Sequence, residues 1–329
     1  MRTALLTAGL LIGLLSSVVL SLAVGARPLS VAEILNVLRD HGSAEATALL
    51  WDYRLPRTLV ALLVGAALAV AGGLIQAFTR NPLADPGILG VNAGAAFAVT
   101  VAIAALGVVD TSGLIVAALL GAAVASLAVV AIGAGGRGPA TPLRTTLAGV
   151  ALAAVLGGVT SGLRLLDPGT FDRFRVWAAG SVAGPDLAQL VSVAPWIGIG
   201  LLIALGVTRP LNAIALGEDL AGSLGVRLAP ARVLAVGAVT LLAGAATAIA
   251  GPISFLGLMV PHAVRWTVGP DQRRILPLSV LGGALLLLVS DVLARVVLPG
   301  RELPVGVVTA FVGAPVLVLL VRRRRVSGL

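Results

Sequence analysis

Residues 54–95 read RLPRTLVALLVGAALAVAGGLIQAFTRNPLADPGILGVNAGA and form two apolar runs joined by a short polar corner. The corner is Asn81–Gly87, which contains Pro82 and Pro86. Each proline fixes its own φ and disfavours helix in the residue before it, and Gly87 permits a sharp reversal. The stretch therefore predicts two membrane-spanning helices that meet at a rigid elbow.

The composition extends this prediction to the whole chain. Of its 329 residues, 58% are hydrophobic and 11% are charged, and the mean hydropathy is +1.08. A water-facing surface cannot cover so much apolar material, which excludes a soluble protein. Apolar runs separated by short charged loops predict one transmembrane domain over residues 1–329, in which the 41 glycines allow close helix packing.

Two residue types are missing from the sequence. Without cysteine the chain has no disulfide, thiol catalysis or Fe–S ligation. All 23 basic residues are arginine, so there is no lysine to reach the phosphates in a P-loop. If ATP drives this protein, another chain must bind the ATP.

Hydropathy and the positions of the polar loops predict ten membrane spans. These are Thr3–Val24, Thr58–Phe78, Leu89–Val108, Gly113–Ala134, Thr145–Leu163, Leu190–Val207, Val233–Ala250, Ile253–Trp266, Ile275–Val297 and Val305–Val321. The eighth, Ile253–Trp266, is short enough for a re-entrant segment. We keep it because an even number of crossings places Arg2 and Arg322–Arg325 on the same side of the membrane.

The distribution of arginine predicts the orientation. With ten spans, 14 arginines lie on the side of the termini and 9 on the other side, so the positive-inside rule places both termini in the cytoplasm. A cleaved signal peptide at Met1–Ala26 is the alternative, but its apolar run is longer than usual for such a peptide. We expect a multi-pass protein of a bacterial inner (cytoplasmic) membrane.

Ionisable residues are scarce within the predicted spans. Asp291 and Arg295 are four residues apart near the outer end of the ninth span, a spacing that predicts an ion pair along a helix. His262 lies in the inner half of the eighth span, and we expect it to be packed or hydrogen-bonded rather than a metal ligand. We predict no catalytic site and no metal site.

Two polar segments outside the spans suggest contacts with other molecules. Arg54 and Arg57 flank Pro56 where the second span begins, and cations are unfavourable at the positive end of a helix. A partner protein or lipid phosphates would explain them equally well. On the inner side, the loop Arg209–Arg232 is long for a connector and predicts short amphipathic helices that lie on headgroups or contact a partner.

The corner and the RLPR segment resemble the FecCD-type permeases of ABC importers for iron-siderophores, haem and cobalamin. Further matching segments are Leu147–Leu152, Trp177–Ser181, Gly251–Leu258, Pro261-His262, Glu302–Pro304 and Gly313–Pro315. The ordered set runs from Arg54 to Val321 and is most similar to permeases for ferric catecholate siderophores such as ferric enterobactin.

The resemblance implies an all-α type II ABC importer permease that pairs with an identical or second permease around a central path. Two ATPase subunits, which bind ATP and Mg²⁺, lie beneath it, and a periplasmic or lipid-anchored substrate-binding protein lies above. The substrate is a ferric siderophore moved by alternating access. The chain itself is then no enzyme, binds no cofactor and has no nucleic-acid partner.

The resemblance also assigns residues to these roles. Arg54, Arg57 and Arg295 receive acidic residues of the binding protein. The coupling loop that engages the ATPase contains Gly217, Glu218, Asp219, Ala221, Leu224 and Gly225. The inner gate contains Thr141, Pro142 and Leu143, where the cobalamin permeases carry small hydroxyl residues. The polar residues Gln76, Asn81 and Asn92 either line part of the path or hydrogen-bond a neighbouring helix.

Other functions remain open at this point. A haem or cobalamin importer would belong to the same family. An ATP-independent secondary carrier or channel would carry a buried charged relay or broken helices at the middle of the membrane, which the sequence does not indicate. A membrane scaffold without transport would need neither a polar seam nor an outer arginine cluster.

Overall fold

A computed structural model describes residues 2–135, 142–298 and 300–322, and every regular element in these ranges is a helix. Ten helices correspond to the ten predicted spans: α1 (Arg2–Ala23), α4 (Leu55–Thr79), α5 (Val91–Leu106), α6 (Thr111–Ala134), α7 (Pro142–Leu166), α9 (Leu187–Gly206), α12 (Leu228–Ala250), α13 (Leu256–Val268), α14 (Gln272–Val296) and α15 (Val305–Arg322). The all-α membrane fold is therefore confirmed.

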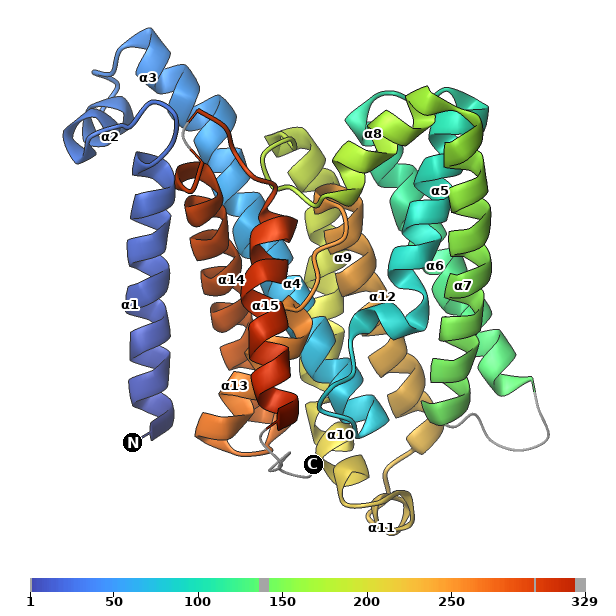
Figure 1. The fold of residues 1–329 in the computed structure, drawn as a ribbon. Coiled ribbons are helices and arrows are strands. Elements are labelled where there is room, and N and C mark those ends of the chain that lie inside the picture. Colours follow the sequence, from blue (N-terminus) through green and yellow to red (C-terminus); the bar gives the residue numbers. More distant parts are fainter. Residues whose placement is uncertain (1, 136–141, 299, 323–329) are drawn as a thin grey trace.

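Most of the shorter elements lie at the two ends of the bundle, and the 3₁₀-helix η2 (Pro86–Leu89) lies between the long helices (Figure 1). The others are α2 (Val31–Leu38), α3 (Ala44–Ala48), the π-helix η1 (Leu49–Arg54), α8 (Pro168–Ala178), α10 (Thr208–Ala215) and α11 (Glu218–Ser223). Figure 1 shows α2, α3 and α8 at one end, and α10 and α11 at the other end, where α1 begins and α15 ends.

Seven helical segments are long and apolar enough to cross a membrane, and α5 and α15 contain shorter apolar stretches. The remaining segment, α13, has 13 residues and is preceded by non-helical backbone at residues 251–254. It is the segment that the sequence already marked as short. The count of ten crossings stays a prediction.

The second span begins earlier than the sequence predicted. A continuous helical stretch runs over residues 44–79, through α3, η1 and α4. Pro56 has no N–H for the carbonyl of Asp52, and the preceding turn widens so that Leu55 N–H donates to Leu50 O, five residues back. Arg54 therefore does not lie at an exposed helix start, and the expected unfavourable dipole contact is absent there.

The elbow also differs in detail from the prediction. α4 ends at Arg80, which adopts a left-handed conformation with φ 51°, and the 3₁₀-helix η2 ends at Gly90 with φ 75°. Asp85 caps η2 by accepting a hydrogen bond from Gly87 N–H at 2.8 Å. Arg80 and Gly90, rather than Gly87, make the reversals of the chain.

Helix α4 is the central helix of the bundle and packs against α9, α12, α13 and α14. Glycines bring its backbone close to two of these neighbours. A Cβ built on Gly72 would lie 1.9 Å from Gly257 O of α13, and one on Gly65 would lie 2.4 Å from Gly283 O of α14. Small residues at these positions are thus a steric requirement.

Glycines also let the elbow lie close to two helices, α7 and α13. A Cβ on Gly149 of α7 would lie 1.8 Å from Ile88 O, and one on Gly257 of α13 would lie 3.3 Å from Pro86 Cδ. The 3₁₀-helix η2 therefore touches helices from both sides and positions the start of α5.

Replacing Gly72 by alanine tests the close packing of α4. The new methyl group must push α13 away, so we expect the free energy of unfolding to fall by about 2 kcal/mol. Thermal unfolding in detergent micelles measures the effect. Gly158→Ala is the matched control, because nothing lies within 4 Å of a Cβ at Gly158 in the helix α7. Equal melting temperatures for the two variants would contradict the packing argument.

Candidate functional site

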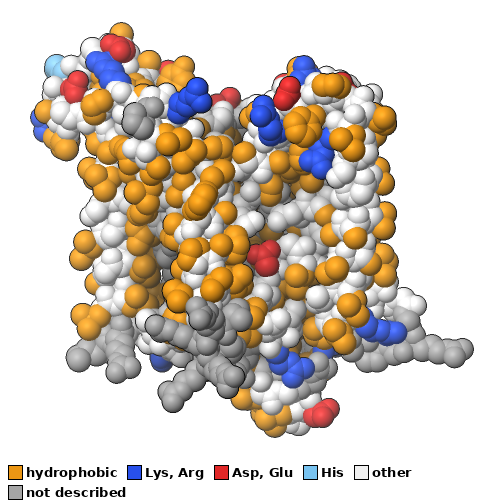
Figure 2. Space-filling view, in the orientation of Figure 1, with side chains coloured by type: hydrophobic (Ala, Val, Ile, Leu, Met, Phe, Trp, Pro, Cys, Tyr) orange, Lys and Arg blue, Asp and Glu red, His pale blue; other side chains and the backbone are white. Residues whose placement is uncertain are grey.

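Charged side chains lie mainly at the two ends of the bundle. On the face drawn in Figure 2 the band between the ends is mostly apolar, with one acidic patch in the hollow between the α1, α14 and α15 side and the α5 to α8 side. We call the end that carries α2 and α8 the outer end and the end that carries α10 and α11 the inner end, after the orientation that the sequence predicts (Figure 1). Both ends are candidate sites for contact with other molecules.

The outer end contains a buried ion cluster centred on Asp291 of α14, whose side chain is 1% exposed. Arg57 donates to Asp291 through Nε (3.0 Å to Oδ2) and Nη2 (2.9 Å to Oδ1). Arg295 donates to the same carboxylate through Nε at 3.1 Å. The predicted ion pair between Asp291 and Arg295 is confirmed, and the cluster joins α4 to α14.

Two arginines of this end are bound by backbone carbonyls of the chain itself. Arg295 Nη1 donates to Ser21 O at 2.7 Å and to Val24 O at 3.1 Å, at the end of α1. Arg54, which is 4% exposed, donates to Leu22 O and Arg27 O. Both side chains thus hold the outer end of α1 against the bundle.

This geometry changes the expectation that all three arginines receive acidic residues directly. Arg54 and Arg295 are buried and already bonded, so a partner would have to break these contacts to reach them. The side chain of Arg57 is 13% exposed, and its Nη1 donates to Glu302 Oε2 at 2.6 Å. Glu302, in the loop between α14 and α15, is 39% exposed and was not singled out as a site by the sequence.

The inner loop forms the two short helices that the sequence predicted, α10 and α11. Ala221 of α11 is fully buried and packs with Ile214 of α10 and Ala231 of α12. Asp219, Leu220 and Leu224 around it are exposed. The loop is therefore anchored by its buried residues and presents both polar and apolar side chains outward.

The inner loop is also tied to the start of α14. Asn212 of α10 donates to Asp271 Oδ1 at 2.6 Å, and its own oxygen accepts from Gln272 N–H at 2.8 Å. Burial of the Asp271 carboxyl opposes its ionisation, but hydrogen bonds from Arg273 N–H and from Asn212 hold the pKa below its ordinary value. These two contacts tie α10 to the helix that carries Asp291.

The side chain of Gln76 is fully buried between α4 and α13. Pro261 lacks an N–H and leaves the carbonyl of Gly257 without its helical partner, and Gln76 Nε2 donates to that carbonyl at 3.1 Å. Arg265 Nη2 in turn donates to Gln76 Oε1 at 3.1 Å. Of the two roles left open for Gln76, the structure supports the helix contact.

The other predicted path residues have varied surroundings. Asn81 is exposed, and its Oδ1 accepts from Leu83 N–H at 2.9 Å. Asn92 is partly exposed and accepts from Thr247 Oγ1 of α12 at 3.0 Å. At the start of α7, Pro142 is partly exposed and Leu143 is 69% exposed. Thr141 lies outside the described residues.

Two buried ionisable groups lie in α13. His262 is 5% exposed and packs edge-on against Trp266, as expected of a packed histidine. Arg265, which the sequence analysis did not single out, is also 5% exposed. Within the described ranges, no group of three potential metal ligands occurs.

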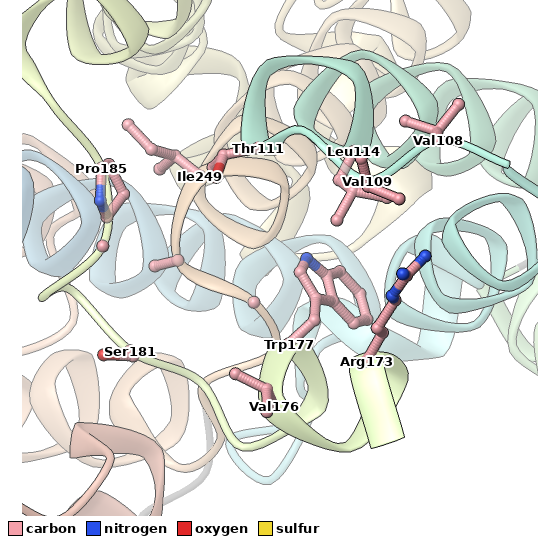
Figure 3. A pocket seen from close by; sticks show the side chains of 13 residues that line it. Val108, Val109, Thr111, Leu114, Arg173, Val176, Trp177, Ser181, Pro185 and Ile249 are labelled. Atoms are coloured by element: carbon pink, nitrogen blue, oxygen red, sulfur yellow. The ribbon is translucent and has the colours of Figure 1, made fainter. Parts of the chain in front are cut away.

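A cavity of about 420 Å³ lies at the outer end beside α8. Figure 3 shows Trp177 and Val176 of α8 facing Leu114 of α6 and Ile249 of α12 across it. Arg173 is the one charged residue of its otherwise largely apolar wall. The cavity therefore has no constellation of nucleophile, acid and base.

Comparisons with known proteins show similarity to a family of transport proteins along nearly the whole chain. Residues 12–323 match the FecCD transport family. The chain is 48% identical to the ferric enterobactin transport system permease protein FepD of Escherichia coli, over 97% of this chain and 96% of that one. It is 39% identical to the siderophore transport system permease protein YfiZ of Bacillus subtilis, over 94% and 93% of the two chains.

A solved structure shares the fold. It is a metal-chelate type ABC transporter in an inward-facing conformation, with a TM-score of 0.87 and 31% sequence identity. The match covers 97% of this chain and 99% of that chain. The similarity in fold thus extends over almost the whole chain.

Neutralising Asp291 tests the structural role of the ion cluster. Asp291→Asn leaves Arg57 and Arg295 with an uncompensated buried charge, so we expect the free energy of unfolding to fall by about 3 kcal/mol. Asp172→Asn is the control, because the pair between Asp172 and Arg175 is 69% exposed on both sides and should change stability by less than about 0.5 kcal/mol. The midpoint of thermal unfolding is measured for both variants in detergent micelles. An Asp291→Asn variant that kept the wild-type midpoint would contradict this role.

Proposed function

Because this chain belongs to the FecCD transport family, we propose that it is the membrane-spanning permease of an ATP-driven importer of ferric siderophores. The observation that carries this proposal is the similarity to a ferric enterobactin permease along nearly the whole chain. Permease subunits of this family form the path through the membrane and are not enzymes. ATP and Mg²⁺ are bound by a separate ATPase, in keeping with the absence of lysine from this sequence.

The path is proposed to lie between two permeases, which are identical or closely related. Helix α7 supports this assembly, because only 17% of the residues in its most apolar 18-residue stretch are buried within the chain. Its exposed apolar residues need lipid or a second permease to cover them. Asn81, Pro142 and Leu143, together with Thr141, are proposed to line the inner part of the path.

The inner loop is proposed to couple ATP hydrolysis to transport. Residues Gly217–Gly225 would contact the ATPase through the outward side of α11, and the buried Ala221 would carry the motion into α10 and α12. The contact between Asn212 and Asp271 extends this connection to α14. A bistable bundle moved in this way would open alternately to the two sides of the membrane.

The outer end is proposed to dock an acidic substrate-binding protein, in the periplasm or anchored to lipid. Arg57 would make the direct contact, because its guanidinium reaches the surface. Arg54 and Arg295 would contribute positive charge from below and keep α1 in place. With this end outside, the inner loop and both termini lie in the cytoplasm of a bacterial cell.

Reconstitution in liposomes tests the function. We expect uptake of ferric enterobactin only when the permease is combined with a partner ATPase, a ferric enterobactin-binding protein and ATP. Haem and cobalamin, offered in parallel, should be taken up poorly. Uptake driven by an ion gradient through this chain alone would reject the proposal.

The same liposomes test the inner loop. Glu218→Arg should lower the ATP hydrolysis that accompanies uptake by about tenfold or more, because it reverses a charge at the proposed ATPase contact. Glu218→Asp, which keeps the negative charge at this position, is the matched control and should retain coupling. Full coupling in the Glu218→Arg variant would remove this role from the loop.

Removing the charge of Arg57 tests the docking surface. Arg57→Gln should weaken binding of the same binding protein by about tenfold at low salt, because a charge-assisted contact is lost. Arg175→Gln removes an exposed outer arginine whose partner is Asp172, and it should have little effect. Equal losses in the two variants would mean that general positive charge, rather than Arg57, attracts the partner. Surface plasmon resonance with permease in nanodiscs measures both affinities.

A further inference from the structure

Glu302 is the one acidic residue of the outer ion cluster that reaches the surface. Asp291 is buried and receives both Arg57 and Arg295, so it cannot leave without stranding two charges. Glu302 has a single ion-pair partner, Arg57, and its side chain is 39% exposed. Its carboxylate can therefore turn into water at little cost, since partly exposed ion pairs contribute little to stability.

Positive charges outnumber negative charges by one in the outer ion cluster. Arg54, Arg57 and Arg295 carry three positive charges, and Asp291 and Glu302 carry two negative charges, which leaves one positive charge uncompensated. The guanidinium of Arg57 offers three nitrogens. Asp291 accepts from Nε and Nη2, and Glu302 accepts from Nη1 at 2.6 Å. The Glu302 carboxylate lies at the most exposed corner of this guanidinium, so an incoming carboxylate that bonds Nη1 competes with Glu302 there.

We propose that Glu302 is a placeholder carboxylate, which occupies Arg57 while the outer face is free and is displaced by a carboxylate of the docking binding protein. This inference rests on the proposed docking function. Asp291 keeps the guanidinium in position during the exchange, so the arginine is already oriented when the partner arrives. The cost of removing Glu302 limits the affinity, which favours release of the binding protein after each delivery.

The proposal predicts that Glu302 opposes docking. Glu302→Gln and Glu302→Ala should each strengthen binding of the ferric enterobactin-binding protein that supports uptake in the liposomes by about two- to fivefold at low ionic strength. The gain should shrink at high salt, because the removed carboxylate acts through charge. Affinity is measured with wild-type and variant permeases in nanodiscs, assembled with the ATPase.

Two matched variants keep the test specific. Glu45→Gln removes an acid of the same outer end that pairs with Arg27, and it should leave the affinity unchanged. In the Arg57→Gln background, Glu302→Gln should give no gain, because the two side chains act on the same contact. A gain that persists without Arg57, or that Glu45→Gln reproduces, would overturn the placeholder role.

The alanine variant separates this role from simple support of Arg57. If Glu302 only held the guanidinium in place, Glu302→Ala would weaken docking, and that result would overturn the proposal. Unchanged affinity in both Glu302 variants would do the same. If instead the wild-type permease neither binds this protein nor imports ferric enterobactin, the proposed function itself fails.

Discussion

The bundle depends on the close approach of backbones along α4. Lipid is as apolar as a leucine side chain, so helices in a membrane gain little from hydrophobic burial and must gain from contact. At Gly65 and Gly72 the absence of a side chain lets α4 touch the backbones of α14 and α13. These contacts fix the positions of both neighbours, and hence of the residues that they carry toward the two ends.

The polar groups inside the bundle follow from this arrangement. Pro261 interrupts the hydrogen bonds of α13, and the carbonyl that it leaves free lies next to α4, where Gln76 reaches it. At the outer end, α14 lies close enough to α4 for Arg57 to bond Asp291. A buried polar atom in lipid needs such a partner, because water cannot supply one. The contacts therefore make the bundle specific as well as stable.

The two ends of the molecule are joined through the same helices. Asn212 and Asp271 connect the inner loop to the start of α14, and Asp291 lies near its outer end. A force applied to α10 and α11 thus acts on a helix that ends in the outer ion cluster. This continuous connection provides a physical route between a partner below and a partner above, both of which belong to the proposed importer.

Composition and the alternation of apolar runs with polar loops were sufficient to predict the helical membrane fold, the approximate limits of its segments and the elbow after α4. They were also sufficient to predict the inner helices and the pair between Asp291 and Arg295. These features depend on residues near one another in the chain. The burial of Arg54, the helix contact of Gln76 and the meeting of Arg57 with Glu302 were decided by tertiary structure. Their partners are distant in sequence, 245 residues in the last case, and hydropathy does not encode which distant helices become neighbours.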